Sequence, residues 1–419
     1  MFRGYLRVGA SELANTSRLL AHIHHGVPVT DAVLSDPLTV CSACVPHVGY
    51  DDSWPGLQAV TGGDYVVESA PWYDPSVPES AEFAGVWLMD AQGFESAKVS
   101  RDIAESVCVG GVPGRARLPS QSLSFSALLV ACSDAGVRYG ITWLTCVLRQ
   151  ADSRTGVTIE YYAAHPSGTA ATPESLRREM RGVVMTSSPT LGDVAGKGGG
   201  HDHRQATAYR VDWEMAATDP YAYASPVSSA VIWETITEDP ITWAHAPDCA
   251  DTQACGLPTM YSAACEPPTV PVVSAAIPTC SGCLPVCAVE RRVWTLTGST
   301  GAVCDDTVVT VSVANLGDDP LTVSLYWRPC GEDALCDREA PLQIAGLPVG
   351  YTAVADSMTG RPYLESEGIT YRQVGIVGTP TGAPWRPTTL DTTMCWELVA
   401  ESAIGAEYDV TVVQRGRHA

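Results

Sequence analysis

Residues 306–315 read DTVVTVSVAN, and this stretch sets the class of the fold. Its alternation places Val309, Val311 and Val313 on one face, because successive side chains of a strand point to opposite sides. One apolar face and one polar face are typical of a half-buried antiparallel strand. The stretch therefore predicts a sheet that packs one side against a core.

Similar short segments fill the rest of the C-terminal part and are separated by Gly, Asp or Pro turns. They are RRVWTLTG (291–298), DDPLTVSLYWRP (318–329), LQIAGLPVGYTAVAD (342–356), YRQVGIVG (371–378), CWELVAES (395–402) and YDVTVVQRG (408–416). This regular spacing of short strands is typical of a sandwich. We therefore expect a β-sandwich over residues 289–419.

Strands are also expected in the N-terminal part, at 86–89, within SQSLSFSALLVACS (120–133) and from residue 207 onward. The last of these places Tyr209, Val211, Trp213 and Met215 on one face. Two segments stay open between strand and helix, one around Leu19–Leu20 and one at VRYGITWLTCVLRQ (137–150). In the second, apolar residues at helical spacing favour a helix, whereas Gly140 and the β-branched residues argue against it.

Residues 166–205 read as an excursion from the strand pattern. Thr172-Pro173-Glu174 is a helix-start signal and predicts a helix over 173–184. A Gly-rich loop with GKGGG (196–200) comes next, but no Ser or Thr comes after Lys197, so a phosphate-binding loop is not predicted. The resulting division is 1–165, 166–205, 206–246, 247–288 and 289–419.

A Cys- and Pro-rich stretch, 249–287, separates the two strand-rich parts. It holds six of the fifteen cysteines and six prolines. Three states remain open for these cysteines: free thiols in a packed connector, disulfides, or thiolate ligands of zinc. The residues concerned are Cys249, Cys255, Cys265, Cys280, Cys283 and Cys287.

Other chemistry-bearing groups are small and scattered. His22, His24 and His25 could form a metal site or belong to a solvated surface segment, and the same alternatives hold for His201 and His203. Cys41 and Cys44 form a CxxC, but a zinc ribbon would need a second CxxC in similar context, which is absent from the sequence nearby. Cys330 and Cys336 flank one loop, where free thiols are weighed against a local bridge. No GxSxG or HExxH motif occurs, so no catalytic residue is predicted.

Composition narrows the class of protein further. Charged residues make up 17%, and 37 Gly with 30 Pro suit an all-β protein. The formal net charge of −22 disfavours nucleic-acid binding, because phosphates would repel such a surface. The opening MFRGYLRVG lacks the apolar core of a signal peptide, and no apolar run is long enough to span a membrane. We expect synthesis in a reducing compartment and no membrane insertion.

Several segments together resemble minor tail proteins of long-tailed phages that infect actinobacteria. They are FRGYLRVGASELANTSRLLAHI (2–23), APWYDPSVPESAEFAGVWLMDAQGFESAKVSRDIAES (70–106), ALLVACSDAGVRYGITWLTCVL (127–148), VDWEMAATDPYAYASPV (211–227), GLPVGYTAVADSMTGRPYLESEG (346–368) and VGIVGTPTGAPWRPTTLDTTMCWELVAESAIGAEYDVTVVQRG (374–416). The resemblance covers most of 1–245 and 290–419, in order. It is patchy in 166–205 and in the cysteine stretch.

The resemblance implies a distal tail protein, a ring subunit where the tail tube meets the tail tip. It implies an N-terminal β-barrel or sandwich (1–165, closed by strands in 206–246) that forms a hexameric ring, and a galectin-like β-sandwich at 289–419. Implied partners are other copies of the chain, the tail tube protein, the tape measure protein, the tail hub and other tail-tip proteins. The implied place is the virion tail tip, after assembly in the host cytoplasm. No cofactor is implied.

Two other functions are kept as alternatives. One is a carbohydrate-binding tail module at the host surface, with Trp327, Tyr363 and Trp385 as candidate residues that stack on sugar rings, although core aromatics are the ordinary reading. The other is a tail-associated cell-wall hydrolase, for which the sequence offers no specific residues.

Overall fold

The chain forms two compact units, seen in a computed structural model: unit 1, Met1–Ser225 with Arg417–Ala419, and unit 2, Pro226–Gly416. The predicted mainly β fold is confirmed, because most of the described chain is in antiparallel strands. The structure describes residues 1–23, 67–106, 109–164, 173–194, 208–240, 244–245, 258–259, 288–296, 306–331, 338–372, 375–380 and 382–418.

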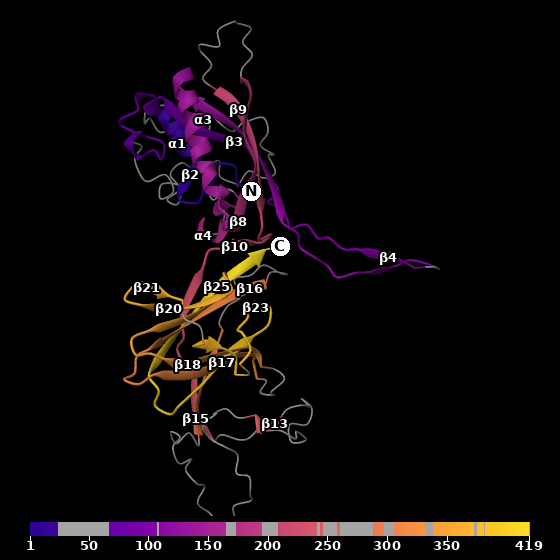
Figure 1. Ribbon diagram of the computed structural model, residues 1–419, viewed down its shortest axis with the longest axis vertical. Helices are drawn as coiled ribbons and strands as arrows, with labels where there is room; N and C mark the ends of the chain where they lie inside the picture. The colour runs from indigo at the N-terminus through magenta and orange to yellow at the C-terminus, as the bar shows by residue number, and fades with distance from the viewer. Residues whose placement is uncertain are drawn as a thin grey trace, which may run out of the picture. The chain divides into compact units, whose positions relative to one another are not determined.

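Unit 1 is built on one strongly curved antiparallel sheet (Figure 1). Its strands run in the order β2-β1-β7-β8-β9-β6-β3, and β10 also pairs with β8. Strands β2 and β3, at the two ends of this order, contact each other. The bounds are β1 (Tyr5–Val8), β2 (Ser11–Asn15), β3 (Phe83–Gln92), β6 (Gln121–Ala131), β7 (Val157–Tyr162), β8 (Arg177–Val194), β9 (Ala208–Ala217) and β10 (Ala222–Ala224).

Helices of unit 1 pack against this sheet. The open segment around Leu19 is the helix α1 (Thr16–Ile23), which contacts β3. The open segment 137–150 lies in the helix α3 (Asp134–Leu148), which contacts β3 and β6. The other helical turns are η3 (Val67–Ser69), η4 (Pro78–Ala81), η5 (Arg149–Asp152) and α4 (Pro173–Leu176).

Gly140, which argued against a helix, has a packing role in α3. A Cβ at this position would lie 2.3 Å from Phe83 Cε2, so the missing side chain lets the helix approach the Phe83 ring. Phe83 is fully buried and meets Trp72 edge-on at 5.3 Å between ring centroids. Ser133 begins the helix by accepting a hydrogen bond from the Gly136 N–H at 3.1 Å.

The predicted helix over 173–184 is wrong beyond its first turn. Only Pro173–Leu176 is helical, and the chain continues as the long strand β8. Over 177–183, β8 pairs with β7 on one edge and with β10 and then β9 on the other, while Met180 and Val183 are buried. The capping signal was local, whereas two neighbouring strands decide the conformation of the residues after it.

The predicted faces of the unit 1 strands agree with the structure. In β9, Val211, Trp213 and Met215 are buried and Tyr209 is half-buried. In β6, alternate residues from Gln121 to Ala131 are buried, so the apolar run has one core face. These two strands lie side by side, and the Phe125 and Trp213 rings stack at 5.0 Å across the pair.

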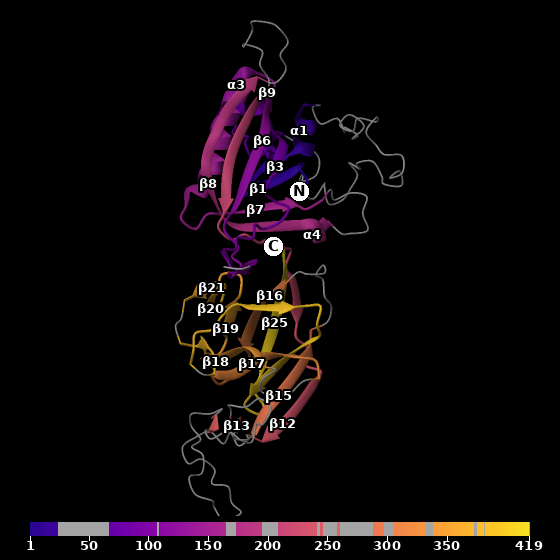
Figure 2. The ribbon, with the colours of Figure 1, turned by 90° about the vertical axis from the view of Figure 1, so that its right-hand side faces the viewer.

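Unit 2 is a sandwich of two sheets around one core (Figure 2). One sheet has the order β12-β15-β24-β17-β18-β22, and the other contains β25-β16-β19-β20-β21 with β11 on β25 and β23 on β16. The bounds are β11 (Val227–Ala230), β12 (Thr235–Pro240), β15 (Ala288–Thr295), β16 (Asp306–Asn315), β17 (Leu321–Pro329), β18 (Glu339–Leu347), β19 (Thr352–Asp356), β20 (Arg361–Ser366), β21 (Ile369–Tyr371), β22 (Val377–Gly378), β23 (Thr388–Asp391), β24 (Trp396–Ser402) and β25 (Tyr408–His418).

The stretch 306–315 is strand β16, as predicted. Val309, Val311 and Val313 are all buried in the core of unit 2, which also contains Val323 and Leu398 from the other sheet. The predicted closing range 206–246 is divided in the structure, since β9 and β10 belong to unit 1 and β11 and β12 to unit 2. Within 244–259, the short strands β13 (Ala244–His245) and β14 (Pro258–Thr259) pair with each other.

The helices of the described ranges include none with the length and apolarity needed to cross a membrane.

Candidate interaction surface

A β-hairpin between β3 and β6 is the main exposed feature of unit 1. Residues 98–118, called the arm below, contain β4 (Ile103–Glu105), which pairs with β5 (Gly111–Pro113), and a bridge from Ser100 to Arg117. Figure 1 shows the arm as a thin extension that leaves the core of unit 1. All its described residues, 98–106 and 109–118, are exposed.

The arm presents apolar side chains to solvent. Val109 is 91% exposed, and Val112, at 67%, and Ile103, at 63%, lie on the paired strands. Exposed aliphatic side chains gathered on one extension are characteristic of an interaction surface rather than of a free monomer. An isolated two-stranded hairpin is also only marginally stable in water. The arm therefore has the properties of a segment that another surface covers.

The charge of the arm differs from that of the chain. The arm contains four basic and two acidic residues, whereas the whole chain has a formal net charge of −22. The basic residues are Lys98, Arg101, Arg115 and Arg117, and the acidic ones are Asp102 and Glu105. A basic, apolar extension on an acidic protein is complementary to an acidic surface.

The root of the arm is held firmly in unit 1. Gln121 is 4% exposed, and its side-chain Nε2 donates to the Gly93 carbonyl at 2.7 Å and to the Ser96 carbonyl at 2.8 Å. Phe94 packs edge-on against Tyr161, with 4.7 Å between ring centroids, and against Phe125 at 5.7 Å. These contacts fix the point at which the arm leaves the core.

Tyr161 at this root is affected by its surroundings. Burial raises the pKa of Tyr161 to about 12, and the nearby Glu95 carboxylate adds to the rise while Arg178 opposes it. The phenol is therefore neutral over the physiological range, and Tyr161 does not titrate near neutral pH.

Sequence reasoning missed the arm. The signal that could have identified it is Gly110, a turn residue that directly precedes β5 and lies between Ile103 and Val112 in the sequence. Gly110 has a φ of +75°, which a Gly turn residue adopts without steric cost. Nothing in the spacing alone could have shown that both strands would be exposed.

The three aromatic residues predicted for sugar stacking do not come together on one exposed face. Trp327 is 2% exposed and Trp385 is 9% exposed, and both belong to the core of unit 2. Tyr363 lies half-buried on β20, where burial and the nearby Glu365 and Asp356 carboxylates raise the pKa of its phenol. Carbohydrate stacking stays a prediction for Tyr363 alone.

The cysteine predictions have different outcomes. Cys249, Cys255, Cys265, Cys280, Cys283 and Cys287 lie outside the described residues, as do Cys41, Cys44, His24, His25, His201 and His203. His22 is buried. Within the described ranges, no group of three or more His, Cys, Asp or Glu side chains is arranged to hold a metal ion.

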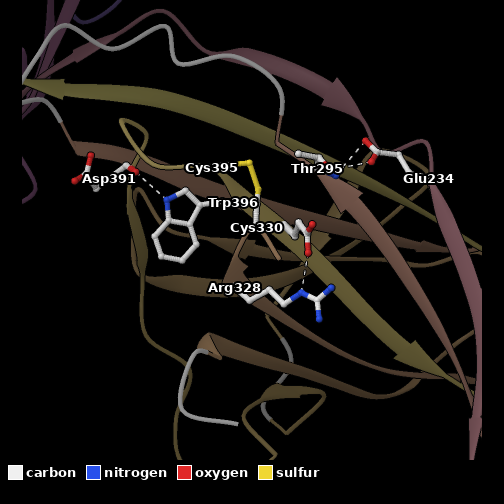
Figure 3. Close-up of a disulfide and its surroundings, with 8 residues drawn as sticks. Glu234, Thr295, Arg328, Cys330, Asp391, Cys395 and Trp396 are labelled. Carbon is white, nitrogen blue, oxygen red and sulfur yellow. Dashed lines mark hydrogen bonds and ion pairs between the residues drawn. A yellow bond between two sulfur atoms is a disulfide. The ribbon is translucent and has the colours of Figure 1, made fainter. Parts of the chain in front are cut away.

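For Cys330, the structure shows neither of the two states expected from the sequence, a free thiol or a local bridge to Cys336. Cys330 forms a disulfide with Cys395 (Figure 3), so it is neither a free thiol nor bonded to Cys336. Cys336 itself lies outside the described residues. Strand pairing between β17 and β24 brings these two residues together across 65 positions of sequence, which no local spacing could indicate. Cys132 and Cys146 in unit 1 are free and exposed.

Among comparisons with known proteins, only the search of solved structures found similar chains. No protein-family model and no curated protein matches the chain. The SPP1 Dit protein, described as a paradigm of the hub adsorption apparatus in phages that infect Gram-positive bacteria, aligns over 81% of this chain and 96% of its own length, with 12% identity and a TM-score of 0.43. The phage P2 baseplate in its activated conformation aligns over 78% and 90%, with 8% identity and a TM-score of 0.40. Because both TM-scores lie below 0.5, this likeness to phage hub and baseplate proteins assigns no function by itself.

Proposed function

We propose that the chain is a structural protein of a phage tail tip, a ring subunit of the distal tail type that joins the tail tube to the tip complex and supports host attachment. The sequence resemblance over most of 1–245 and 290–419, in order, supports this family. Two separate β cores, the second a sandwich, agree with the ring domain and galectin-like sandwich that the resemblance implies. Its place would be the virion tail tip, after assembly in the host cytoplasm.

The partners follow from the same proposal. A second copy of the chain is the first, in a homo-hexameric ring, and the tail tube protein, the tape measure protein, the tail hub and other tail-tip proteins are the others. The non-enzymatic reading agrees with the sequence, in which no GxSxG or HExxH motif occurs.

The arm is the observation that carries self-association. It is anchored at its root by Gln121, exposes aliphatic side chains along its length and, among the described strands, leaves the outer edges of β4 and β5 unpaired. Unpaired strand edges with apolar side chains are templates for contact with another chain. An acidic second copy also complements the basic arm.

Assembly of the purified chain tests the proposal. Wild-type protein should form a closed ring in particle averages, and its mass in light scattering should correspond to a hexamer. Replacing Ile103 and Val112 together by Asp should convert the ring to monomers, because burial of a carboxylate without a partner opposes the interface.

A matched control distinguishes the arm from any exposed apolar position. Ile369 on β21 is 55% exposed, an exposed fraction similar to those of Ile103 and Val112 in the arm. The control variant Ile369→Asp should leave the ring intact. A wild-type chain that stays monomeric at high concentration and is absent from virions by mass spectrometry would reject the proposed function. Rings that survive the arm substitutions would reject the role of the arm only.

A further inference from the structure

The pair Cys330 and Cys395 lies at the end of a strand ladder that holds together without it. Strands β17 and β24 pair from Val323↔Ser402 through Pro329↔Trp396, and the Cys330 N–H then donates to the Cys395 carbonyl at 3.1 Å. The two Cα atoms are 5.4 Å apart, within the range that a disulfide requires. Backbone pairing therefore places the two sulfur atoms within bonding reach before any bond forms.

Side chains around the pair fix the same geometry independently. The Arg328 guanidinium donates to the Glu397 carboxylate at 2.8 Å across the two strands. Trp396, next to Cys395, is buried and donates from its indole N–H to the Asp391 carbonyl at 2.8 Å (Figure 3). These contacts contain no sulfur, so the reduced chain keeps the same arrangement.

The bond is open to soluble reagents. Cys395 is exposed and Cys330 is half-buried, in contrast to structural disulfides that are enclosed in a core. Exposed disulfides exchange with soluble thiols more readily than enclosed ones and are the labile, regulatory ones. An oxidant or reductant in solution can therefore reach Cys395 in the folded protein.

We propose that Cys330 and Cys395 form a redox-controlled lock on unit 2, open in reducing surroundings and closed by a low-molecular-weight disulfide such as glutathione disulfide. The exposed Cys395 thiolate attacks one sulfur of glutathione disulfide, forming a mixed disulfide and releasing one glutathione thiolate. The Cys330 thiolate then attacks Cys395 Sγ, closing the protein bond and releasing the second glutathione. The two protons of the protein thiols end on the two glutathiones, so the protein loses two electrons and glutathione disulfide gains them.

Closing the lock constrains a large part of unit 2. The bond closes a loop of 65 positions that contains β18 to β23. On the chain-entropy model, a loop of this length lowers the equilibrium constant for unfolding by about a thousandfold, mainly by restricting the unfolded chain. If the chain is assembled in the host cytoplasm, as the proposed function holds, the lock closes after release. The redox response itself does not depend on that function.

The test uses the full chain in two glutathione buffers, one mostly reduced and one mostly oxidised. Free thiols are trapped with N-ethylmaleimide, and the Cys330–Cys395 peptide is quantified by mass mapping. Guanidinium unfolding and hydrogen exchange of β17 and β24 are measured in both buffers. We expect the peptide to be bonded only in the oxidised buffer, exchange protection in both, and an unfolding midpoint for unit 2 about 1 M higher when oxidised.

Two double variants isolate the lock from the other cysteines. Cys330→Ser with Cys395→Ser should fold and lose the redox dependence of the unit 2 midpoint, whereas Cys132→Ser with Cys146→Ser should keep it. Loss of β17 and β24 protection in the reduced wild-type chain would overturn the proposal. So would a bond that stays closed in millimolar reduced glutathione, or a redox-dependent midpoint that persists in the Cys330/Cys395 variant.

Discussion

The substitution Gly140→Ala examines why a glycine lies in the middle of α3. In an exposed helix, Gly→Ala stabilises by about 1 kcal/mol, because alanine has the higher helix propensity. Here the new methyl group would lie 2.3 Å from Phe83 Cε2, 2.5 Å from Cδ2 and 2.8 Å from Cζ. Carbon atoms in contact are normally about 3.5–4.0 Å apart, so the ring must move by roughly 1 Å.

The Phe83 ring has little room for such a shift. It is fully buried and contacts Trp72 at 5.3 Å and Trp143 at 5.9 Å, measured between ring centroids, and these two indoles also contact each other at 5.7 Å. Overpacking of this kind costs about 1–3 kcal/mol, and the disturbed aromatic pairs add to it. After the gain in helix propensity, we expect Gly140→Ala to destabilise unit 1 by about 1–2 kcal/mol.

Guanidinium unfolding followed by circular dichroism measures this change, and hydrogen exchange of the α3 amides assigns it to unit 1. Thr142→Ala, at an exposed position of the same helix, is the control and should change the stability by less than about 0.5 kcal/mol. In the background Phe83→Leu the methyl group no longer meets the ring, so Gly140→Ala should cost less there. A stabilisation near 1 kcal/mol in the wild-type background would refute the packing role of Gly140.

Two other expectations concern a buried indole and a buried phenol. Trp327→Ala removes a ring that is 2% exposed and should destabilise unit 2 by about 3–5 kcal/mol in guanidinium unfolding. The control Tyr371→Ala, at a residue that is 39% exposed, should cost less than about 1 kcal/mol. Similar losses of stability at both positions would contradict the assignment of Trp327 to the core. Tyr161 has a pKa raised by burial from 10.0 to about 12, so its contribution is fully present below pH 10 and is lost as the pH rises through about 12. Phenolate absorbance recorded with circular dichroism should show Tyr161 ionising together with unfolding, and the Tyr161→Phe variant should unfold at a higher pH than the wild-type chain. Ionisation of Tyr161 near pH 10 in a folded chain would argue against the buried environment.

The sequence predicts the strands well where one face is buried. In β16 and β9 the period of two appears directly in Val309, Val311 and Val313 and in Val211, Trp213 and Met215, because burial on one side selects apolar residues at alternate positions. The class of fold and the sandwich of the C-terminal part follow from such patterns. They depend only on residues that are neighbours in sequence.

The features that were not predicted depend on residues far apart in the sequence. Gly140 argues against a helix until Phe83 is known to lie against it. The helix signal at Thr172-Pro173-Glu174 is real for one turn, but pairing with β7 and β9 makes the residues after that turn a strand. The partner of Cys330 lies 65 positions away and becomes its neighbour only through β17 and β24.

The arm shows a different limit. Its turn is indicated by Gly110, but its exposure depends on the rest of unit 1 leaving it uncovered. Nearly every side chain in an arm without a core is exposed, so neither a period of two nor one of 3.6 marks it. Interaction surfaces of this kind become visible only when the cores are accounted for.

The path of the chain has a consequence for the order in which its two units are completed. Unit 2 is one continuous segment, Pro226–Gly416, inserted between the main part of unit 1 and its last residues. Arg417 pairs with Tyr223, and His418 with Ala222, so one edge of β10 is completed by residues that the ribosome makes after all of unit 2. All of unit 2 is therefore synthesised before the residues that complete this edge of unit 1. A chain cut anywhere within unit 2 would lack Arg417 and His418 and would leave that edge of β10 open.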